Sequence, residues 1–217
     1  MVDIYASMEA AKDIGGDFYD FFRIDDDHIA LVIADVCGKG IPAALFMAVS
    51  RTIIRSKGMQ GCTASACLKE SNQLLAAYSV DNMFVTVFYA IYDLKTGFIS
   101  YCNAGHNPPN LLRKDGSVSE LPTSKNTICG VFDDLVYQED TLQMEQGDTL
   151  VMFTDGVTEA TDAGDNEFGS ERLVSILHHQ ADASCQQTVE AVKAGIKEFV
   201  GDAEQSDDIT MLVVKRL

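Results

Sequence analysis

Aspartates recur at the ends of apolar segments along this chain. Asp17 follows two glycines, Asp35 and Asp155 each close an apolar run, and Asp207 with Asp208 stands directly before another. A single aspartate in such a place is usually a helix cap or a solvated turn residue. Because the coincidence repeats, we interpret these acids as ligands of a hard divalent cation such as Mg²⁺ or Mn²⁺, which prefers carboxylate oxygens.

A pair of such ions would supply hydrolytic chemistry. Two dications about 3.5 to 4 Å apart share one water molecule and lower its pKa, so that it attacks near neutral pH. Conversely, burial of a carboxylate at the end of a strand costs desolvation free energy unless a cation neutralises its charge. The acids therefore predict a metal centre that activates water.

The segments around Asp17 and Asp35 predict how these two acids meet. Phe18–Ile24 and Ile29–Ala34 have the composition of strands, and the acidic residues between them are typical of a turn. In an antiparallel hairpin the start of one strand lies beside the end of the other, so both carboxylates would meet at one sheet edge. The glycines after Asp35 allow a tight turn, and Pro42 suits the first turn of a helix.

The remaining pattern predicts more strands than helices, joined mostly by short turns, which favours antiparallel sheets. Helices come in two pairs, one early and one late, and each pair can cover an outer face of a two-sheet stack. The expected fold class is therefore α+β, a four-layer α/β/β/α sandwich of two mainly antiparallel sheets flanked by helix pairs. Later segments expected as strands are Met83–Asp93, Val136–Leu142 and Asp148–Thr154; expected helices begin at Thr63, Ser170 and Ser184.

Length and composition narrow the classes of function. The 217 residues suit a single domain spanning 1–217, and the abrupt start at a motif suggests a module excised from a longer multidomain signalling protein. A net charge of −17 argues against nucleic acid or an anionic membrane as partner. Six cysteines without metal-binding spacing indicate reduced thiols in a cytoplasmic protein. Without a long apolar run or signal peptide, no membrane insertion is expected.

Six motifs occur in the order expected of one family. Together they resemble the SpoIIE/RsbU-like bacterial branch of the metal-dependent type 2C (PPM) serine/threonine phosphatases, over about Ile4 to Lys215. Six motifs in order at plausible spacing are far more specific than any one of them. The motifs are GGDFYDFF (15–22), IADVCGKGIPAALFM (33–47), CNAGHNPP (102–109), FTDGVTEA (153–160), FGSERL (168–173) and SDDITMLVVK (206–215).

The resemblance implies a role for each acid in holding two Mn²⁺ or Mg²⁺ ions. It implies that Asp35 bridges the two ions and that the carbonyl of Val36 binds the second. Asp17 would lie at or near the second ion, with Asp20 in support.

The first ion, by the same resemblance, would be held by Asp155 and Asp207. Asp208 is the alternative to Asp207, since adjacent acids are not distinguished by sequence. The implied reaction is hydrolysis of phosphoserine or phosphothreonine by in-line attack of activated water, without a phosphoenzyme.

Two departures from the family pattern concern proton transfer and phosphate binding. Cys37 stands where many eukaryotic relatives have a histidine thought to protonate the leaving oxygen, and residues 1–20 contain no convincing match to their phosphate-binding arginine. The general acid is therefore unassigned. His106 in the CNAGHNPP motif invites an acid-base role, but we favour the interpretation that it stabilises a turn by hydrogen bonding.

The family implies a phosphorylated protein as substrate, expected to be an anti-sigma-factor antagonist, and an upstream sensor or regulatory domain. A homodimer is possible. The alternative function is a catalytically silent regulatory binding module with the same fold, against which the full set of acids argues. A cyclic-dinucleotide synthase, suggested by the GGDFYDFF motif, is disfavoured because only fourteen residues precede Gly15.

Overall fold

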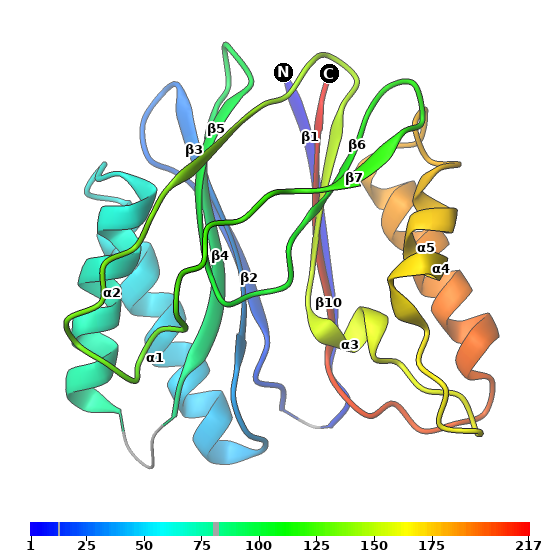
Figure 1. The fold of residues 1–217 in the computed structure, drawn as a ribbon, viewed down its shortest axis with the longest axis horizontal. Helices are drawn as coiled ribbons and strands as arrows, with labels where there is room; N and C mark the ends of the chain where they lie inside the picture. The colour runs from blue at the N-terminus through cyan, green and yellow to red at the C-terminus, as the bar shows by residue number, and fades with distance from the viewer. Residues whose placement is uncertain (13, 80–82) are drawn as a thin grey trace. The chain divides into compact units, whose positions relative to one another are not determined.

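The computed structural model describes residues 1–12, 14–79 and 83–217. These residues form two compact units, each built on one sheet (Figure 1). The central unit comprises Ile14–Pro108 and Pro122–Gln143. The terminal unit comprises Met1–Asp13, Pro109–Leu121 and Met144–Leu217.

The central unit contains an antiparallel sheet and two long helices. Apolar residues of β3 and β4 are buried on both faces of the sheet, as a continuous apolar run predicts. Residues such as Ala30, Val32 and Val87 share one core with Ile54 and Leu68 of the helices, so the helix pair covers one face of this sheet. Across the sheet the strands are β2 (Phe18–Arg23), β3 (His28–Val36), β4 (Val85–Asp93), β5 (Phe98–Ala104) and β8 (Asp140–Gln143); the helices are α1 (Ile41–Gly58) and α2 (Ala64–Tyr78).

Local sequence signals set where these helices begin. Gly40 is the N-cap of α1 with a φ of 80°, a backbone conformation that glycine adopts without strain, and Pro42 occupies the first turn. Thr63 caps α2, where its side chain accepts a hydrogen bond from the backbone N–H of Ala66 at 3.3 Å. Both helix starts confirm the sequence prediction.

The terminal unit contains the second antiparallel sheet, in which the first and last strands of the chain pair side by side (Figure 1). Val151 and Met211 of this sheet share a core with Leu173, Val189 and further residues of α4 and α5, so these helices cover one face. Across the sheet the strands are β1 (Val2–Glu9), β10 (Ile209–Arg216), β9 (Thr149–Phe153), β6 (Asn110–Leu112) and β7 (Val118–Glu120); the helices are α3 (Asp155–Thr158), α4 (Gly169–Leu177) and α5 (Cys185–Val200).

The α+β prediction of two antiparallel sheets, each with a helix pair, is confirmed, but one strand is shorter than expected and one short helix was not expected. The segment Val136–Leu142 was expected to be a strand throughout, whereas β8 begins only at Asp140. Val136 is 79% exposed, and the Asn126 side chain instead bonds the backbone N–H and carbonyl of Gln138. The short helix α3 was not predicted. A single domain over 1–217 stays a prediction.

All six cysteines are unbridged, in agreement with the sequence interpretation. Burial raises the pKa of the Cys67 and Cys129 thiols to about 12, so both are protonated at neutral pH. None of the helices in the described ranges is long and apolar enough to cross a membrane.

Candidate metal centre

The central unit places Asp17 and Asp35 at one edge of its sheet, as predicted. Phe18 pairs with Ala34 in the antiparallel register of β2 and β3, so the residues one step beyond, Asp17 and Asp35, are neighbours. Asp17 is only 2% exposed and Asp35 is half-buried. Two neighbouring carboxylates that are partly shielded from solvent repel each other unless a cation lies near them.

Gly16 brings a third oxygen into this group. A Cβ atom at this position would lie 2.9 Å from the carbonyl oxygen of Val36 and 3.8 Å from Oδ1 of Asp35. Only a residue without a side chain allows the backbone to approach these oxygens so closely. The resulting donors are two carboxylates and one carbonyl, all hard oxygens, and this set fits Mg²⁺ or Mn²⁺.

The terminal unit brings Asp155 and Asp207 together through direct packing of their backbones. Asp155 opens α3 immediately after β9, and a Cβ atom on Gly156 would overlap the carbonyl group of Asp208. The Thr154 hydroxyl joins the same two segments, since it accepts the backbone N–H of Thr210 at 3.1 Å. The TDG motif and the DDIT motif are therefore locked against each other.

Asp207 and Asp208 occupy different environments, which sequence alone did not distinguish. Asp208 is 6% exposed, and its Oδ1 accepts the backbone N–H of Ala11 at 2.9 Å. Asp207 is exposed, and its Oδ1 accepts the backbone N–H of Asp208 at 2.9 Å. Asp208 thus anchors the segment that follows β1, whereas Asp207 lies at the surface, where an ion and substrate have access.

Negative charge accumulates around Asp155 and Asp207. Partial burial raises the pKa of the Glu159 carboxyl above its usual value, and the charges of Asp155, Glu167 and Asp207 raise it further. A dication near these acids would relieve this repulsion. Across the residues that the structure describes, no group of three or more His, Cys, Asp or Glu side chains is already gathered around one point for a metal ion.

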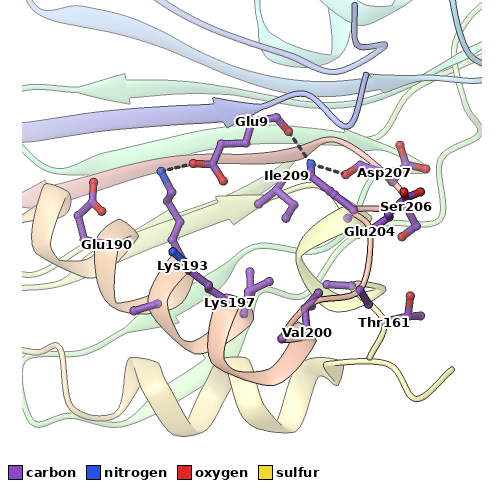
Figure 2. Close-up of a pocket in the computed structure, with 17 residues that line it drawn as sticks. Glu9, Thr161, Glu190, Lys193, Lys197, Val200, Glu204, Ser206, Asp207 and Ile209 are labelled. Atoms are coloured by element: carbon purple, nitrogen blue, oxygen red, sulfur yellow. Dashed lines mark hydrogen bonds and ion pairs between the residues drawn. The ribbon is translucent and has the colours of Figure 1, made fainter. Parts of the chain in front are cut away.

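A cavity of about 500 Å³ in the terminal unit adjoins Gly156 and Asp207. Figure 2 shows Lys193, Val200 and Ile209 around it, with the ion pair between Lys193 and Glu9 as a dashed line. The Gln205 side chain donates to the carbonyls of Glu9 at 2.8 Å and of Asp207 at 2.7 Å. The end of β1 is thereby tied to the backbone of a candidate metal ligand.

The Asp20 carboxylate contacts arginines of α1, and its support of Asp17 stays a prediction. Asp20 is buried, and its carboxylate accepts two hydrogen bonds from Arg55 of α1 at 2.8 and 2.9 Å. Arg51 lies 3.5 Å from the same group. Asp20 therefore ties β2 to α1. Ser50 of the same helix is also buried.

The turn that contains His106 is held by Asn103, which supports the structural interpretation of this motif. The Asn103 side chain accepts the backbone N–H of His106 at 2.7 Å and donates to its carbonyl at 2.9 Å. The imidazole Nδ1 lies 2.9 Å from the hydroxyl of Thr86, a residue that sequence reasoning missed. The single threonine within this apolar strand was the available signal.

Cys37, at the position of the histidine in eukaryotic relatives, forms hydrogen bonds with Phe84, the residue before β4. The backbone N–H of Phe84 donates to its sulfur at 3.1 Å, and its own N–H donates to the carbonyl of Phe84 at 3.0 Å. The thiol is thus a structural acceptor, and it supplies no evident general acid.

Comparison with known proteins gives consistent results. Residues 25–217 match the family model of Stage II sporulation protein E (SpoIIE). The chain is 33% identical over 217 residues to phosphoserine phosphatase RsbU of Bacillus subtilis (strain 168), covering 99% of this chain and 63% of RsbU. It is 31% identical over 240 residues to Protein IcfG of Synechocystis sp. (strain ATCC 27184 / PCC 6803 / Kazusa), covering 98% of this chain but only 38% of IcfG.

The fold is that of solved type 2C phosphatase domains. The SiaA-PP2C domain of Pseudomonas aeruginosa is similar with a TM-score of 0.86 and 22% identity, covering 98% of this chain and 85% of that one. At this identity the likeness shows the fold alone, and the family follows from the sequence match. On the strength of residues 25–217, the chain belongs to the SpoIIE family, the SpoIIE/RsbU-like branch of the metal-dependent type 2C (PPM) phosphatases.

Proposed function

We propose that this chain is a metal-dependent protein serine/threonine phosphatase that hydrolyses phosphoserine or phosphothreonine on a protein partner. The observation that carries the proposal is that each unit packs backbone directly against its acids, at Gly16 for Asp35 and at Gly156 for Asp207 and Asp208. Glycine permits such close approach of the backbone, which is one way in which a chain places groups around a ligand. The name of RsbU, a phosphoserine phosphatase, agrees with this chemistry.

Two Mn²⁺ or Mg²⁺ ions would be held by oxygen atoms only. We assign Asp35 as the bridging ligand, the Val36 carbonyl and Asp17 to one ion, and Asp155 with Asp207 to the other. Asp208 is assigned as an anchor, because its carboxylate already accepts the backbone N–H of Ala11. When bound, such a pair of dications supplies water activated near neutral pH and neutralises charge on a phosphate.

The chain's own residues then have defined tasks. The carboxylates set the charge and position of the centre, and Gly16 leaves the Val36 carbonyl accessible. Thr154 and Asp208 hold the two strand ends that carry Asp155 and Asp207. Because these groups are fixed before substrate arrives, little reorganisation is needed during the reaction.

The substrate we propose is an anti-sigma-factor antagonist in its phosphorylated form. The relatives RsbU and IcfG are longer than this chain, which supports an additional sensor or regulatory domain in the whole protein. Six unbridged cysteines support a cytoplasmic location. A homodimer is compatible with this role.

Mutation of the acids tests the proposal. The purified chain is incubated with a phosphoserine protein and Mn²⁺, with and without a chelator, and phosphate release is measured. Asp35→Asn and Asp155→Asn should each reduce release by at least about 100-fold, because a neutral amide is a poor ligand for a hard dication. Both variants should remain folded by circular dichroism, since loss of one charge relieves repulsion.

Asp202→Asn provides the matched control, because Asp202 is an exposed aspartate of the same unit outside the motifs. It should release phosphate like the unmodified chain. Normal turnover in Asp35→Asn would contradict the ligand assignment. Absence of any metal-dependent phosphate release from the unmodified chain would favour the silent binding module.

A further inference from the structure

The side chains of Thr86 and His106 link the CNAGHNPP motif to the backbone of Asp35. Thr86 lies directly opposite Asp35 in the register of β3 and β4. Its Oγ1 lies 2.9 Å from Nδ1 of His106 and 3.4 Å from the carbonyl oxygen of Asp35. We propose that Thr86 and His106 are positioning residues that fix the Asp35–Val36 peptide for metal binding. This inference rests on the proposed function.

The number of available protons determines which atom donates in each of these two hydrogen bonds. A threonine hydroxyl carries a single proton, so it donates to one partner at a time. The carbonyl of Asp35 can only accept, so in the proposed link the hydroxyl donates to that oxygen. The contact between Oγ1 and the imidazole then requires a proton on Nδ1 of His106. The inference therefore assigns the Nδ1–H tautomer to this histidine.

The imidazole is not needed to hold its own turn. Asn103 binds both the backbone N–H and the carbonyl of His106, and Gly105 supplies the φ of 72° that the turn requires. The His106 residue is 5% exposed. Its side chain is thus placed on a rigid, independently stabilised turn from which it contacts Thr86.

The position of the Asp35 carbonyl, which Thr86 contacts, explains how the link would affect metal binding. The carbonyl of Asp35 belongs to the peptide that joins Asp35 to Val36. Fixing this peptide plane restrains the Val36 backbone, from which the next carbonyl extends, as well as the start of the Asp35 side chain. Loss of groups that orient metal ligands from outside typically reduces metal affinity or activity by 10- to 100-fold.

Binding of Mn²⁺ alone, measured by isothermal titration calorimetry, tests Thr86 without any substrate. Thr86→Val keeps the shape of the side chain and removes the hydroxyl, so Mn²⁺ affinity should fall by about tenfold. Thr86→Ser keeps the hydroxyl and should restore most of the affinity. In phosphatase assays the loss in Thr86→Val should appear in kcat at saturating Mn²⁺, with KM little changed.

Variants of His106 test the second half of the link. His106→Asn places an amide N–H at about the distance of Nδ1 from the backbone and should retain Mn²⁺ affinity. His106→Leu removes the donor and should weaken Mn²⁺ binding as Thr86→Val does. Thr149→Val is the matched control, because Thr149 is buried and its hydroxyl has no hydrogen-bond partner among the described residues. It should leave Mn²⁺ binding unchanged.

The tautomer is read directly by ¹⁵N NMR of histidine-labelled protein at pH 8, with His106→Asn identifying the signal. A protonated Nδ1 is expected, and an Nε2–H tautomer with unprotonated Nδ1 would overturn the inference. Equal Mn²⁺ affinity in Thr86→Val and the unmodified chain would also overturn it. If the unmodified chain neither binds Mn²⁺ nor releases phosphate, the proposed function fails instead. The NMR result on the unmodified chain stands even if a variant does not fold.

Discussion

At the residue scale, two glycines determine how closely the backbone approaches the candidate ligands. Gly16 packs against the carbonyl of Val36, and Gly156 packs against the carbonyl of Asp208. At neither position is there room for a methyl group without movement of a neighbouring backbone. Backbone cannot move aside like the end of a flexible side chain, so these contacts transmit any distortion to the acids.

Gly156→Ala should destabilise the protein by about 1–3 kcal/mol, the usual cost of overpacking, and should weaken Mn²⁺ binding. Thermal and denaturant unfolding of the metal-free protein give the first quantity, and calorimetry gives the second. Gly164→Ala is the control, since Gly164 is exposed and its close neighbours are the side chains of Asn166 and Asp162. Unchanged stability of Gly156→Ala would show that the Asp208 segment can move freely.

The sequence allowed prediction of the acids but not of the groups that hold them. The pairing of Asp17 with Asp35 follows from a short hairpin, in which local turn chemistry fixes the register. The separate roles of Asp207 and Asp208 depend on Ala11, almost two hundred residues away, and on burial. The link from His106 to Thr86 likewise depends on the register of β3, β4 and β5, which no local pattern encodes.

At the scale of elements, a buried carboxylate ties helix α1 to strand β2. Asp20 is 5% exposed, and Arg55 donates two hydrogen bonds to it. Arg55 also lies over the ring of Phe22, at 4.7 Å from its centre. Since α1 begins six residues after Asp35, its placement also constrains the loop that follows Val36.

Arg55→Ala should lower the free energy of unfolding by about 1–2 kcal/mol, because it removes the main partner of a buried charge. Arg51→Ala should cost less than about 0.5 kcal/mol, since the Arg51 side chain is half exposed and its contact is longer. Denaturant titration measures both. Asp20→Asn should be milder than Arg55→Ala, and the reverse order would mean that Asp20 is not effectively desolvated.

Element boundaries were predicted where capping residues mark them. Thr63 and Ser184 were recognised as caps, and Ser184 forms a full capping box with Gln187. The segment before Asp140 was mistaken for strand because its residues have strand composition, while tertiary contacts to Asn126 decided its conformation. Helix α3 is one turn long and has too few residues to show periodicity.

At the scale of the whole molecule, the residues before the family match are structural parts of both units. The family model begins at residue 25, yet β1 and β2 both precede it. Each is the edge strand of its sheet, β1 against β10 and β2 against β3. Their removal would expose two strand edges that now have partners.

A chain that starts at residue 25 should therefore lose cooperative unfolding and aggregate, and should lose Mn²⁺ binding. Circular dichroism during heating and light scattering measure these outcomes. The shortened chain could lose Mn²⁺ binding because it lacks Asp17 or because it lacks two strands. Asp17→Asn in the full chain separates these two causes, because it removes one carboxylate and leaves both strands in place. A cooperative melting transition at the unmodified temperature in the shortened chain would contradict this prediction.

The pairing of β1 with β10 has a consequence for biosynthesis. Residues 2–9 are translated long before their partner, residues 209–216. The central unit has all of its strands once residue 143 has left the ribosome, whereas β1 and β9 of the terminal unit lack their shared neighbour β10 until residue 216 has been made. Asp17 and Asp35 can therefore acquire their surroundings earlier in translation than Asp155 and Asp207 can.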